Sequence, residues 1–207
     1  MWVRGTRLRA APDRVGALID DFTKDTVPKL KEINGNAGAV LLVNRDKGDC
    51  VALTYWRDRA ALDSSESAAT GLRSNVAQKA GATIEEVQRY EMVLMERTGP
   101  PEPGHYVRSV RFTGDTARAD EGVAFLRTTV LPQLKATKGF RALICGLDRT
   151  NGLGIVSTVW NTMADLNASD TSMAQVRQDA IGRFGARDVT IDVYEGVYVE
   201  LAAGAVI

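Results

Sequence analysis

The feature that most constrains this chain is an internal repeat, because its two halves have similar sequences. Shifting the 207 residues by 104 positions aligns 2–97 with 106–201 without a gap, and 22 of the 96 aligned pairs are identical, or 23%. Average composition would give roughly 6% by chance. The identical pairs run along the whole alignment, so we infer a tandem duplication in which both halves adopt the same fold.

A short segment separates the two copies. Residues 98–104 contain three prolines and two glycines in seven positions, which can continue neither a strand nor a helix. We therefore predict two domains, at 1–97 and 105–207, joined by a linker at 98–104.

Each repeat carries the same order of predicted elements. Alternating apolar residues indicate strands, apolar residues at helical spacing indicate helices, and turn signals lie between the middle strands. The predicted elements of the first repeat are a strand at 2–10, a helix from Pro12, strands at 39–43 and 50–56, a helix to about Ala80 and a strand at 83–95. This strand–helix–strand–strand–helix–strand order is that of the ferredoxin-like unit, an α+β fold.

A single ferredoxin-like unit leaves one face of its sheet without helices. The predicted strands are too apolar for that face to stay in water, so each repeat must cover the other. We therefore predict an intramolecular pseudo-dimer whose two sheets face one another around a shared core. Pro28 and Pro132 should break or kink the first helix of each repeat, because a proline ring removes a backbone donor.

Composition excludes several classes of protein. Twenty-six basic residues balance 26 acidic ones, which argues against a nucleic-acid binder, and 44% hydrophobic residues exclude a disordered chain. No apolar run approaches the roughly 20 residues that span a bilayer, and the charged first residues lack a signal-peptide core. We expect a cytoplasmic protein with neither a membrane nor a nucleic-acid partner.

Residues that bind metals are scarce. Cys50 and Cys145 lie in apolar runs and are expected to be buried free thiols, and His105 is the only histidine in the sequence. A metal site needs several His, Cys or carboxylate ligands held close together, and no glycine-rich phosphate loop opens a helix. We therefore expect the protein to carry no haem, flavin or metal.

Motifs repeated in both halves resemble a known family. The motifs are Pro28-x-Leu30, Gly35, Gly48, Thr54-x-Trp56 and Ala60-x-Leu62, with Pro132-x-Leu134, Gly139, Gly152, Thr158-x-Trp160 and Ala164-x-Leu166 in the second repeat. With the order of elements, they resemble the antibiotic-biosynthesis monooxygenase branch of the dimeric α+β barrel superfamily. The resemblance implies a barrel built within one chain. It also implies a small aromatic or enolic ligand and, as one possible activity, monooxygenation without a cofactor.

The haem-degrading enzymes of that superfamily can be compared position by position. They carry an Asn on the first strand, a second Trp after the Thr-x-Trp and a His on the following helix. The matching positions hold Arg7, Ser65 and Ser74 in the first repeat and Arg111, Ser169 and Gln178 in the second. None matches, so we do not expect haem degradation.

Oxygenation without a cofactor needs a dry pocket, a proton acceptor or relay, and a cation that holds an enolate. Arginine is a permanent cation, tryptophan can stack on an aromatic ring and tyrosine can relay a proton. The catalytic candidates are therefore Arg7, Arg73 and Tyr90, and the ligand-binding candidates are Trp56, Arg7, Arg111 and Trp160.

Each candidate also has a structural interpretation. The tryptophans end a strand in both copies, where a buried core residue is common, and both should be largely buried. The arginines can form surface ion pairs, and on a strand Tyr90 and Glu91 point to opposite faces, as do Tyr194 and Glu195.

Two functions from different classes remain open. The first is a cofactor-independent oxygenase or isomerase, and the second is a non-catalytic protein that binds a small hydrophobic ligand or a partner protein. If a site works, we expect it in the first repeat, with Arg7, Trp56 and Arg73 near its pocket. Met163 and Met173 stand where the first repeat has Arg59 and Ala69, and such adaptable side chains make the second pocket more easily plugged than the first.

Overall fold

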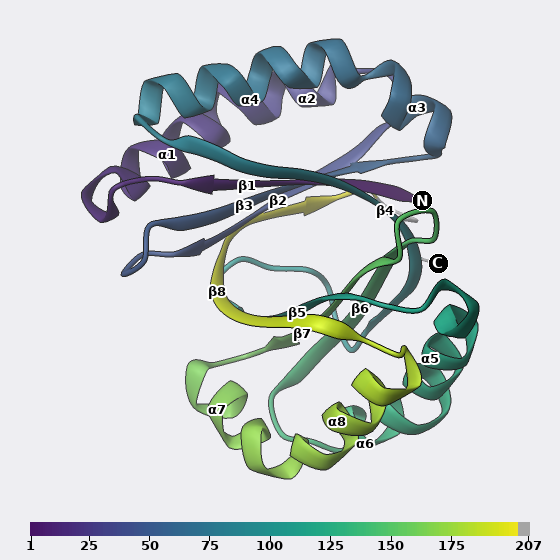
Figure 1. The fold of residues 1–207 in the computed structure, drawn as a ribbon. Helices are drawn as coiled ribbons and strands as arrows, with labels where there is room; N and C mark the ends of the chain where they lie inside the picture. Colours follow the sequence, from purple (N-terminus) through teal and green to yellow (C-terminus); the bar gives the residue numbers. More distant parts are fainter. Residues whose placement is uncertain (203–207) are drawn as a thin grey trace. The chain divides into compact units, whose positions relative to one another are not determined.

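The structure, a computed structural model, describes residues 1–202 and follows the predicted order of elements in both halves (Figure 1). The first half contains β1 (Trp2–Arg9), α1 (Val15–Asp21), α2 (Val27–Lys31), β2 (Asn36–Asn44), β3 (Asp49–Trp56), α3 (Arg59–Ser64), α4 (Glu66–Ala80) and β4 (Thr83–Arg97). Among these, β4 is longer than predicted and continues almost to the linker.

The second half repeats these elements 104 residues later. It contains β5 (Tyr106–Thr113), α5 (Ala119–Phe125), α6 (Leu131–Lys135), β6 (Phe140–Asp148), β7 (Leu153–Trp160), α7 (Met163–Ser172), α8 (Ala174–Arg183) and β8 (Arg187–Leu201). Each of the four strands begins and ends 104 residues after its counterpart in the first half. The second helical segment differs between the halves. In the first half it divides into two helices at Ser65, and in the second half it divides at Met173.

Backbone hydrogen bonds join the strands in the order β1-β3-β2-β8-β5-β7-β6-β4, which closes into a barrel. The pairing of β1 with β3 is antiparallel and places Trp2 opposite Trp56, and β5 pairs with β7 in the same register, with Tyr106 opposite Trp160. This confirms the predicted fold class, an α+β barrel of the dimeric type within one chain.

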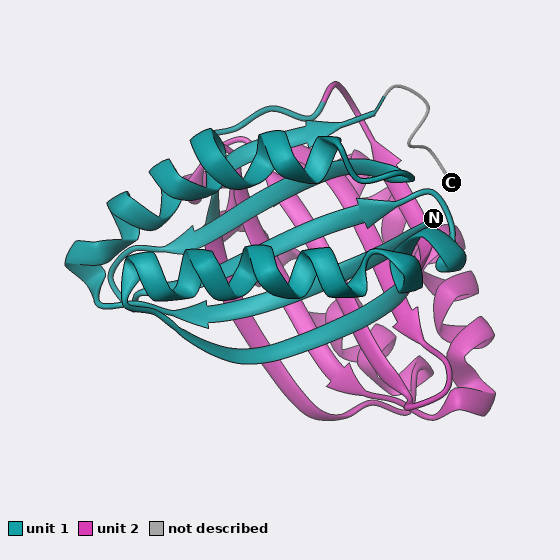
Figure 2. Ribbon diagram, turned by 90° about the horizontal axis from the view of Figure 1, so that it is seen from above, with its two compact units in different colours: residues 1–90, 101–104, 195–205 teal, residues 91–100, 105–194, 206–207 magenta. Residues whose placement is uncertain are grey.

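The chain forms two compact units that differ slightly from the repeats of the sequence (Figure 2). Among the described residues, unit 1 comprises 1–90, 101–104 and 195–202, and unit 2 comprises 91–100 and 105–194. The end of β8 pairs with β2 inside unit 1, and the end of β4 pairs with β6 inside unit 2. Each unit therefore completes its sheet with the end of the other repeat's last strand.

The predicted disturbance at the two prolines takes the form of a π-helical turn. Residues 22–26 and 126–130 have π-helical hydrogen bonding, and each turn leads directly into a short helix with proline near its start. The first helical segment of each half therefore continues through a wider, π-helical turn and does not end before the proline.

Each unit packs its helices on one face of its own sheet and buries a core there (Figure 1). Cys50 and Cys145 lie in these cores as free thiols, as predicted. Within residues 1–202, no helix is long and apolar enough to cross a membrane.

Candidate functional site

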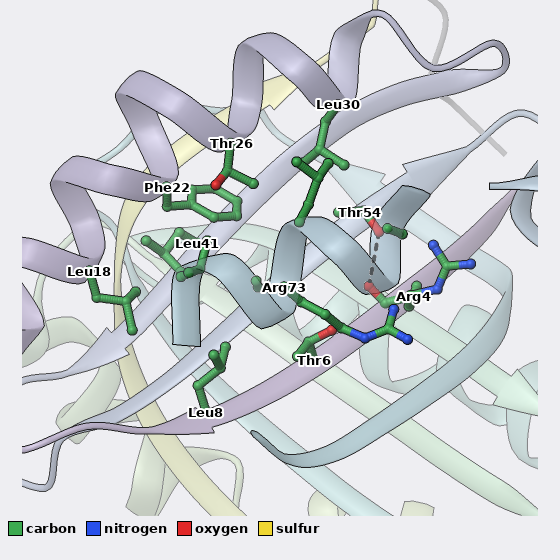
Figure 3. A pocket seen from close by; sticks show the side chains of 14 residues that line it. Arg4, Thr6, Leu8, Leu18, Phe22, Thr26, Leu30, Leu41, Thr54 and Arg73 are labelled. Atoms are coloured by element: carbon green, nitrogen blue, oxygen red, sulfur yellow. Dashed lines mark hydrogen bonds between the residues drawn. The ribbon is translucent and has the colours of Figure 1, made fainter. Parts of the chain in front are cut away.

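Unit 1 encloses a cavity of about 40 Å³ between its sheet and its helices (Figure 3). Strands β1, β2 and β3 form one wall, and the first helical segment and α4 form the other. Leu8, Leu18 and Phe22 line one end, and Arg4 and Arg73 lie together at the other end (Figure 3). We call this space the arginine cavity.

Arg4 reaches the helices because side chains alternate along β1, which directs Arg4, like Leu8, to the covered face. Its side chain is only 2% exposed. One terminal nitrogen donates to Ser65 Oγ (3.1 Å), and the other donates to the Leu62 carbonyl (2.7 Å) and to Glu66 Oε2 (2.8 Å). The guanidinium therefore anchors the junction of α3 and α4 to the sheet.

Glu66 is shared by three arginines. Besides Arg4, Arg73 donates to Oε1 (2.5 Å) and Arg89 to Oε2 (2.7 Å). Burial opposes ionisation of Glu66, but the hydrogen bonds from Arg73 and Arg89 and the charge of Arg4 outweigh it and lower the pKa to about 2. Three guanidinium groups against one carboxylate leave this end of the cavity positively charged.

Two buried nitrogens of the arginines that line this cavity have no hydrogen-bond partner among residues 1–202. They are Nε of Arg4 and one terminal nitrogen, Nη1, of Arg73. An unmet buried donor carries its full desolvation cost, which is larger for a charged group. The wall of the cavity thus carries positive charge and two donors for which the described residues supply no acceptor.

The π-helical turn shapes the wall opposite the arginines. Phe22 and Thr26, its first and last residues, both line the cavity (Figure 3). An extra residue in a helical turn brings both side chains to one face, and such turns are frequent at functional sites.

Unit 2 has an equivalent cavity of about 60 Å³, lined by Arg108 and Arg177. Arg108 donates to Ser169 Oγ (2.7 Å) and pairs with Asp170 (2.6 Å), and Arg177 lies 3.4 Å from the same carboxylate. Two arginines therefore share one carboxylate in unit 2, whereas three arginines share one carboxylate in unit 1.

The expectation that two methionines plug the second cavity is not met. Met173 lines that cavity without making it smaller than its counterpart, and Met163 is 38% exposed on the surface. Met163 is the first residue of α7.

Arg7 and Arg111 lie elsewhere than predicted. Arg7 follows Thr6 on β1 and so points to the face away from the helices, where it pairs with Glu85 (3.6 Å) and Glu86 (3.9 Å). Arg111 pairs with Asp192 (3.1 Å). Neither arginine lines one of the two arginine-bearing cavities.

The two tryptophans are buried at equivalent positions, as predicted. Trp56 is 0% exposed and Trp160 1%, and each ring nitrogen donates to the threonine two residues earlier. Trp160 lines the cavity of unit 2, whereas Trp56 lies under the Arg4 guanidinium, 5.5 Å from it, and does not line the arginine cavity.

The two tyrosines are buried and line neither of the two arginine-bearing cavities. Tyr90 and Tyr194 are each 3% exposed. Arg89, the residue before Tyr90, reaches Glu66 on α4, so Tyr90 points to the opposite face of β4. The structural interpretation of Tyr90 therefore fits its position better than a proton relay in this cavity.

Arg73 lines the cavity as predicted. Arg4, which also lines it, and the Arg4 partners Ser65 and Glu66 are not among the predicted site residues. The sequence does carry a signal for Arg4, which is in phase with Leu8 on the first strand and recurs as Arg108. Ser65 is buried and bonded to Arg4, a contact that its helical position alone does not indicate.

No family model matches the chain. Two Mycobacterium tuberculosis proteins, named uncharacterized protein Rv2557 and uncharacterized protein Rv2558, are similar in sequence. The first is 26% identical over 162 residues (78% of this chain and 72% of the relative), and the second is 24% identical over 196 residues (94% and 83%).

Solved structures show where the fold recurs. An anthrone oxidase-like protein superposes with a TM-score of 0.73 at 16% identity, covering 97% of this chain and 93% of its own. The chain has the fold of the monooxygenase-like barrels. A candidate monooxygenase from Lactobacillus acidophilus gives 0.70 at 11% identity (97% and 95%), and a heme-degrading enzyme from Listeria monocytogenes gives 0.55 at 8% (94% and 99%).

The arginine cavity and its counterpart in unit 2 do not fit a haem. No His, Cys or Tyr lines either of them, and haem iron needs such an axial ligand or a methionine. Met173 lines the unit 2 cavity, but its 60 Å³ is well below the roughly 150 Å³ that holds a single benzene ring. Within residues 1–202, no group of three His, Cys, Asp or Glu side chains could hold a metal ion.

Proposed function

We propose that the arginine cavity binds the anion of a small enolic compound, and that this anion reacts with dioxygen without a cofactor. The observation that carries the proposal is the pair of buried, unpartnered guanidinium nitrogens, Nε of Arg4 and Nη1 of Arg73. An enolate or carboxylate oxygen beside them accepts both hydrogen bonds, and such charge-assisted bonds are the strong ones.

The size of the cavity favours a short enolic ligand over an aromatic one. A cavity of about 40 Å³ takes only a few heavy atoms, whereas a benzene ring needs about 150 Å³. Malondialdehyde, the smallest 1,3-dicarbonyl compound, has fewer heavy atoms than benzene and ionises to an enolate. The apolar end at Leu8, Leu18 and Phe22 receives its carbon atoms.

The oxidase and monooxygenase names among the proteins of the same fold support oxygen chemistry. An enolate is electron-rich and can itself reduce dioxygen. In the net reaction a methylene carbon loses two hydrogens and four electrons and becomes a carbonyl. One oxygen atom of O₂ becomes the carbonyl oxygen, and the other leaves as water with both hydrogens.

Within this reaction the two arginines have a defined role. Arg4 and Arg73 stabilise the negative oxygen and so lower the pKa of the bound enol. The apolar wall excludes water from the carbanionic carbon. Thr6, Thr26 and Thr54 supply the other polar side chains of the lining.

A non-catalytic binding protein is the second candidate, and one observation favours it. Glu66, with a pKa of about 2, is a poor proton acceptor at neutral pH, and no His, Tyr or other carboxylate lines the arginine cavity. The substrate must then ionise through its own acidity and the two arginines alone.

The enolate of malondialdehyde, titrated calorimetrically into the full chain, tests the binding half of the proposal. Arg73→Gln should weaken binding at least about tenfold, because a hydrogen bond to a charged group contributes about 1.5–3 kcal/mol. Arg7→Gln is the control on the opposite face and should leave binding unchanged. Equal affinity in both variants, or no binding at millimolar malondialdehyde, would overturn the proposal.

An oxygen electrode separates the two candidate functions. Enolisable compounds that bind and consume one O₂ per molecule, with loss of uptake in Arg73→Gln, support the oxygenase. Binding without oxygen uptake supports the binding protein. Arg177→Gln, the equivalent change in unit 2, tests whether the second cavity contributes.

A further inference from the structure

A larger cavity lies elsewhere in unit 1, between α2, the start of β2 and the end of β8. Its volume is about 150 Å³. Apolar walls and a polar edge line it, with Val27, Leu30, Ala39 and Leu201 in the walls and Lys31, Tyr198 and Glu200 at the edge. We call it the tyrosine cavity; only Leu30 also lines the arginine cavity.

The tyrosine cavity exists because small residues stand where the second repeat has large ones. Asn36, Ala37 and Ala39 correspond to Phe140, Arg141 and Leu143. In unit 2, Phe140 and Leu143 are buried in the core, and the Phe140 ring packs edge-on against Trp160 at 5.8 Å. Large side chains therefore occupy this place in unit 2, whereas the smaller side chains of unit 1 leave it open.

The polar edge is also partly particular to unit 1. Tyr198 donates its hydroxyl hydrogen to Glu200, whose other oxygen is 2.7 Å from Lys31. Unit 2 keeps the ion pair, as Lys135 and Glu96 at 3.4 Å, but has the buried Leu94 in place of Tyr198. The hydroxyl group is thus added to an ion pair that both repeats share.

The Tyr198 ring is held in place from behind. It packs edge-on against Phe22 at 5.9 Å. Burial, then the hydrogen bond to Glu200, raise the pKa of Tyr198, so the phenol stays protonated and keeps donating to the carboxylate. Lone pairs on the Tyr198 oxygen and on Glu200 remain available to accept from a ligand.

We propose that the tyrosine cavity binds a single neutral hydroxylated aromatic ring, a simple phenol, independently of the arginine cavity. Its volume is about that of a cavity known to hold benzene, and Val27, Leu30 and Leu201 provide apolar contacts. The ligand's O–H donates to the Tyr198 oxygen or to Glu200. The positive charge of Lys31 is already paired with Glu200, so the edge favours a neutral ligand over an anion.

Calorimetric titration of the full chain with phenol and resorcinol tests this site, with cyclohexane carboxylate as the anionic comparison. Both phenols should bind and the carboxylate should not compete with them. Tyr198→Phe keeps the ring and removes the hydroxyl, and should weaken phenol binding about fivefold, the value of one neutral hydrogen bond. Ala39→Leu introduces the residue of the second repeat and should abolish binding by filling the space.

Matched variants distinguish phenol binding in the tyrosine cavity from binding in unit 2 or in the arginine cavity. Glu200→Gln should weaken phenol binding, whereas Glu96→Gln, the equivalent change in unit 2, should not. Arg73→Gln should weaken malondialdehyde binding and leave phenol binding unchanged, so failure of this inference and failure of the proposed function are distinguishable. Phenol affinity that is unchanged in Tyr198→Phe, or absent from the unmodified chain at millimolar concentration, would overturn the inference.

Discussion

Replacing Glu66 by glutamine should destabilise the folded chain by about 2–4 kcal/mol at pH 7. The lowering of the Glu66 pKa from 4.5 to about 2 corresponds to about 3 kcal/mol of interaction with its arginines. A third of the side chain is exposed (34%), so solvent screening reduces this to about 1–2 kcal/mol. The variant also leaves Arg4, 2% exposed, without its counter-charge, which adds a further cost.

The same group makes stability depend on pH in a defined direction. Glu66 has a lower pKa in the folded chain than in the unfolded chain, so its contribution is complete above about pH 4.5. As the pH falls from 4.5 towards 2, the carboxylate takes up a proton and the contribution disappears. The difference in stability between the unmodified chain and Glu66→Gln should therefore shrink across this window.

Guanidinium denaturation followed by tryptophan fluorescence measures both effects. Glu121→Gln is a suitable control, because Glu121 also accepts from two arginines, Arg118 (3.2 Å) and Arg183 (2.9 Å), but all three side chains are at least 41% exposed. Water screens the charges of that cluster, so Glu121→Gln should lower the free energy of unfolding far less than Glu66→Gln does. Equal losses in the two variants, or a loss below about 0.5 kcal/mol in Glu66→Gln, would refute the electrostatic reasoning.

Three further outcomes are expected. Trp56→Ala should lower the free energy of unfolding by about 3–5 kcal/mol in the same assay, because the ring is fully buried, and a loss under about 1 kcal/mol would contradict this. Ala69→Phe, which places a ring in the wall of the arginine cavity, should fill the space of about 40 Å³ and abolish malondialdehyde binding measured by calorimetry. Burial raises the pKa of the Cys50 thiol to about 11 and that of Cys145 to about 12, so a thiol reagent should label neither in the native protein at pH 8 and both in denaturant.

The fold was predictable because each of its determinants is local or repeated. Alternating strands, turn glycines and a gapless duplication define the order of elements without knowledge of any distant contact. The exchange of strand ends was not predictable, because nothing in β4 or β8 marks where pairing passes from one unit to the other. The π-helical turns were anticipated only as a disturbance at Pro28 and Pro132, since the sequence shows the missing donor and not how the helix adapts to it.

The candidate site was only partly predictable from the sequence. Arg4 and Arg7 both recur in the second repeat, so identity between the two copies does not distinguish them. Strand phase assigns Arg4 to the helix-covered face and Arg7 to the other. Glu66 could not be ranked from sequence, because its importance comes from three arginines brought together by β1, α4 and β4.

Comparing the repeats residue by residue gives the strongest reason to expect an unequal division of function. Arg89 in unit 1 is replaced by Val193 in the second repeat, which removes one of the three arginines around the shared carboxylate. Tyr198 likewise takes the place of Leu94 and opens a polar edge that unit 2 lacks at that position. A homodimer encodes both sites once and cannot separate them, whereas a chain that encodes them separately can specialise one and keep the other for stability. Both changes favour unit 1, so Arg73→Gln should impair ligand binding more than Arg177→Gln, and the reverse order would assign the working site to unit 2.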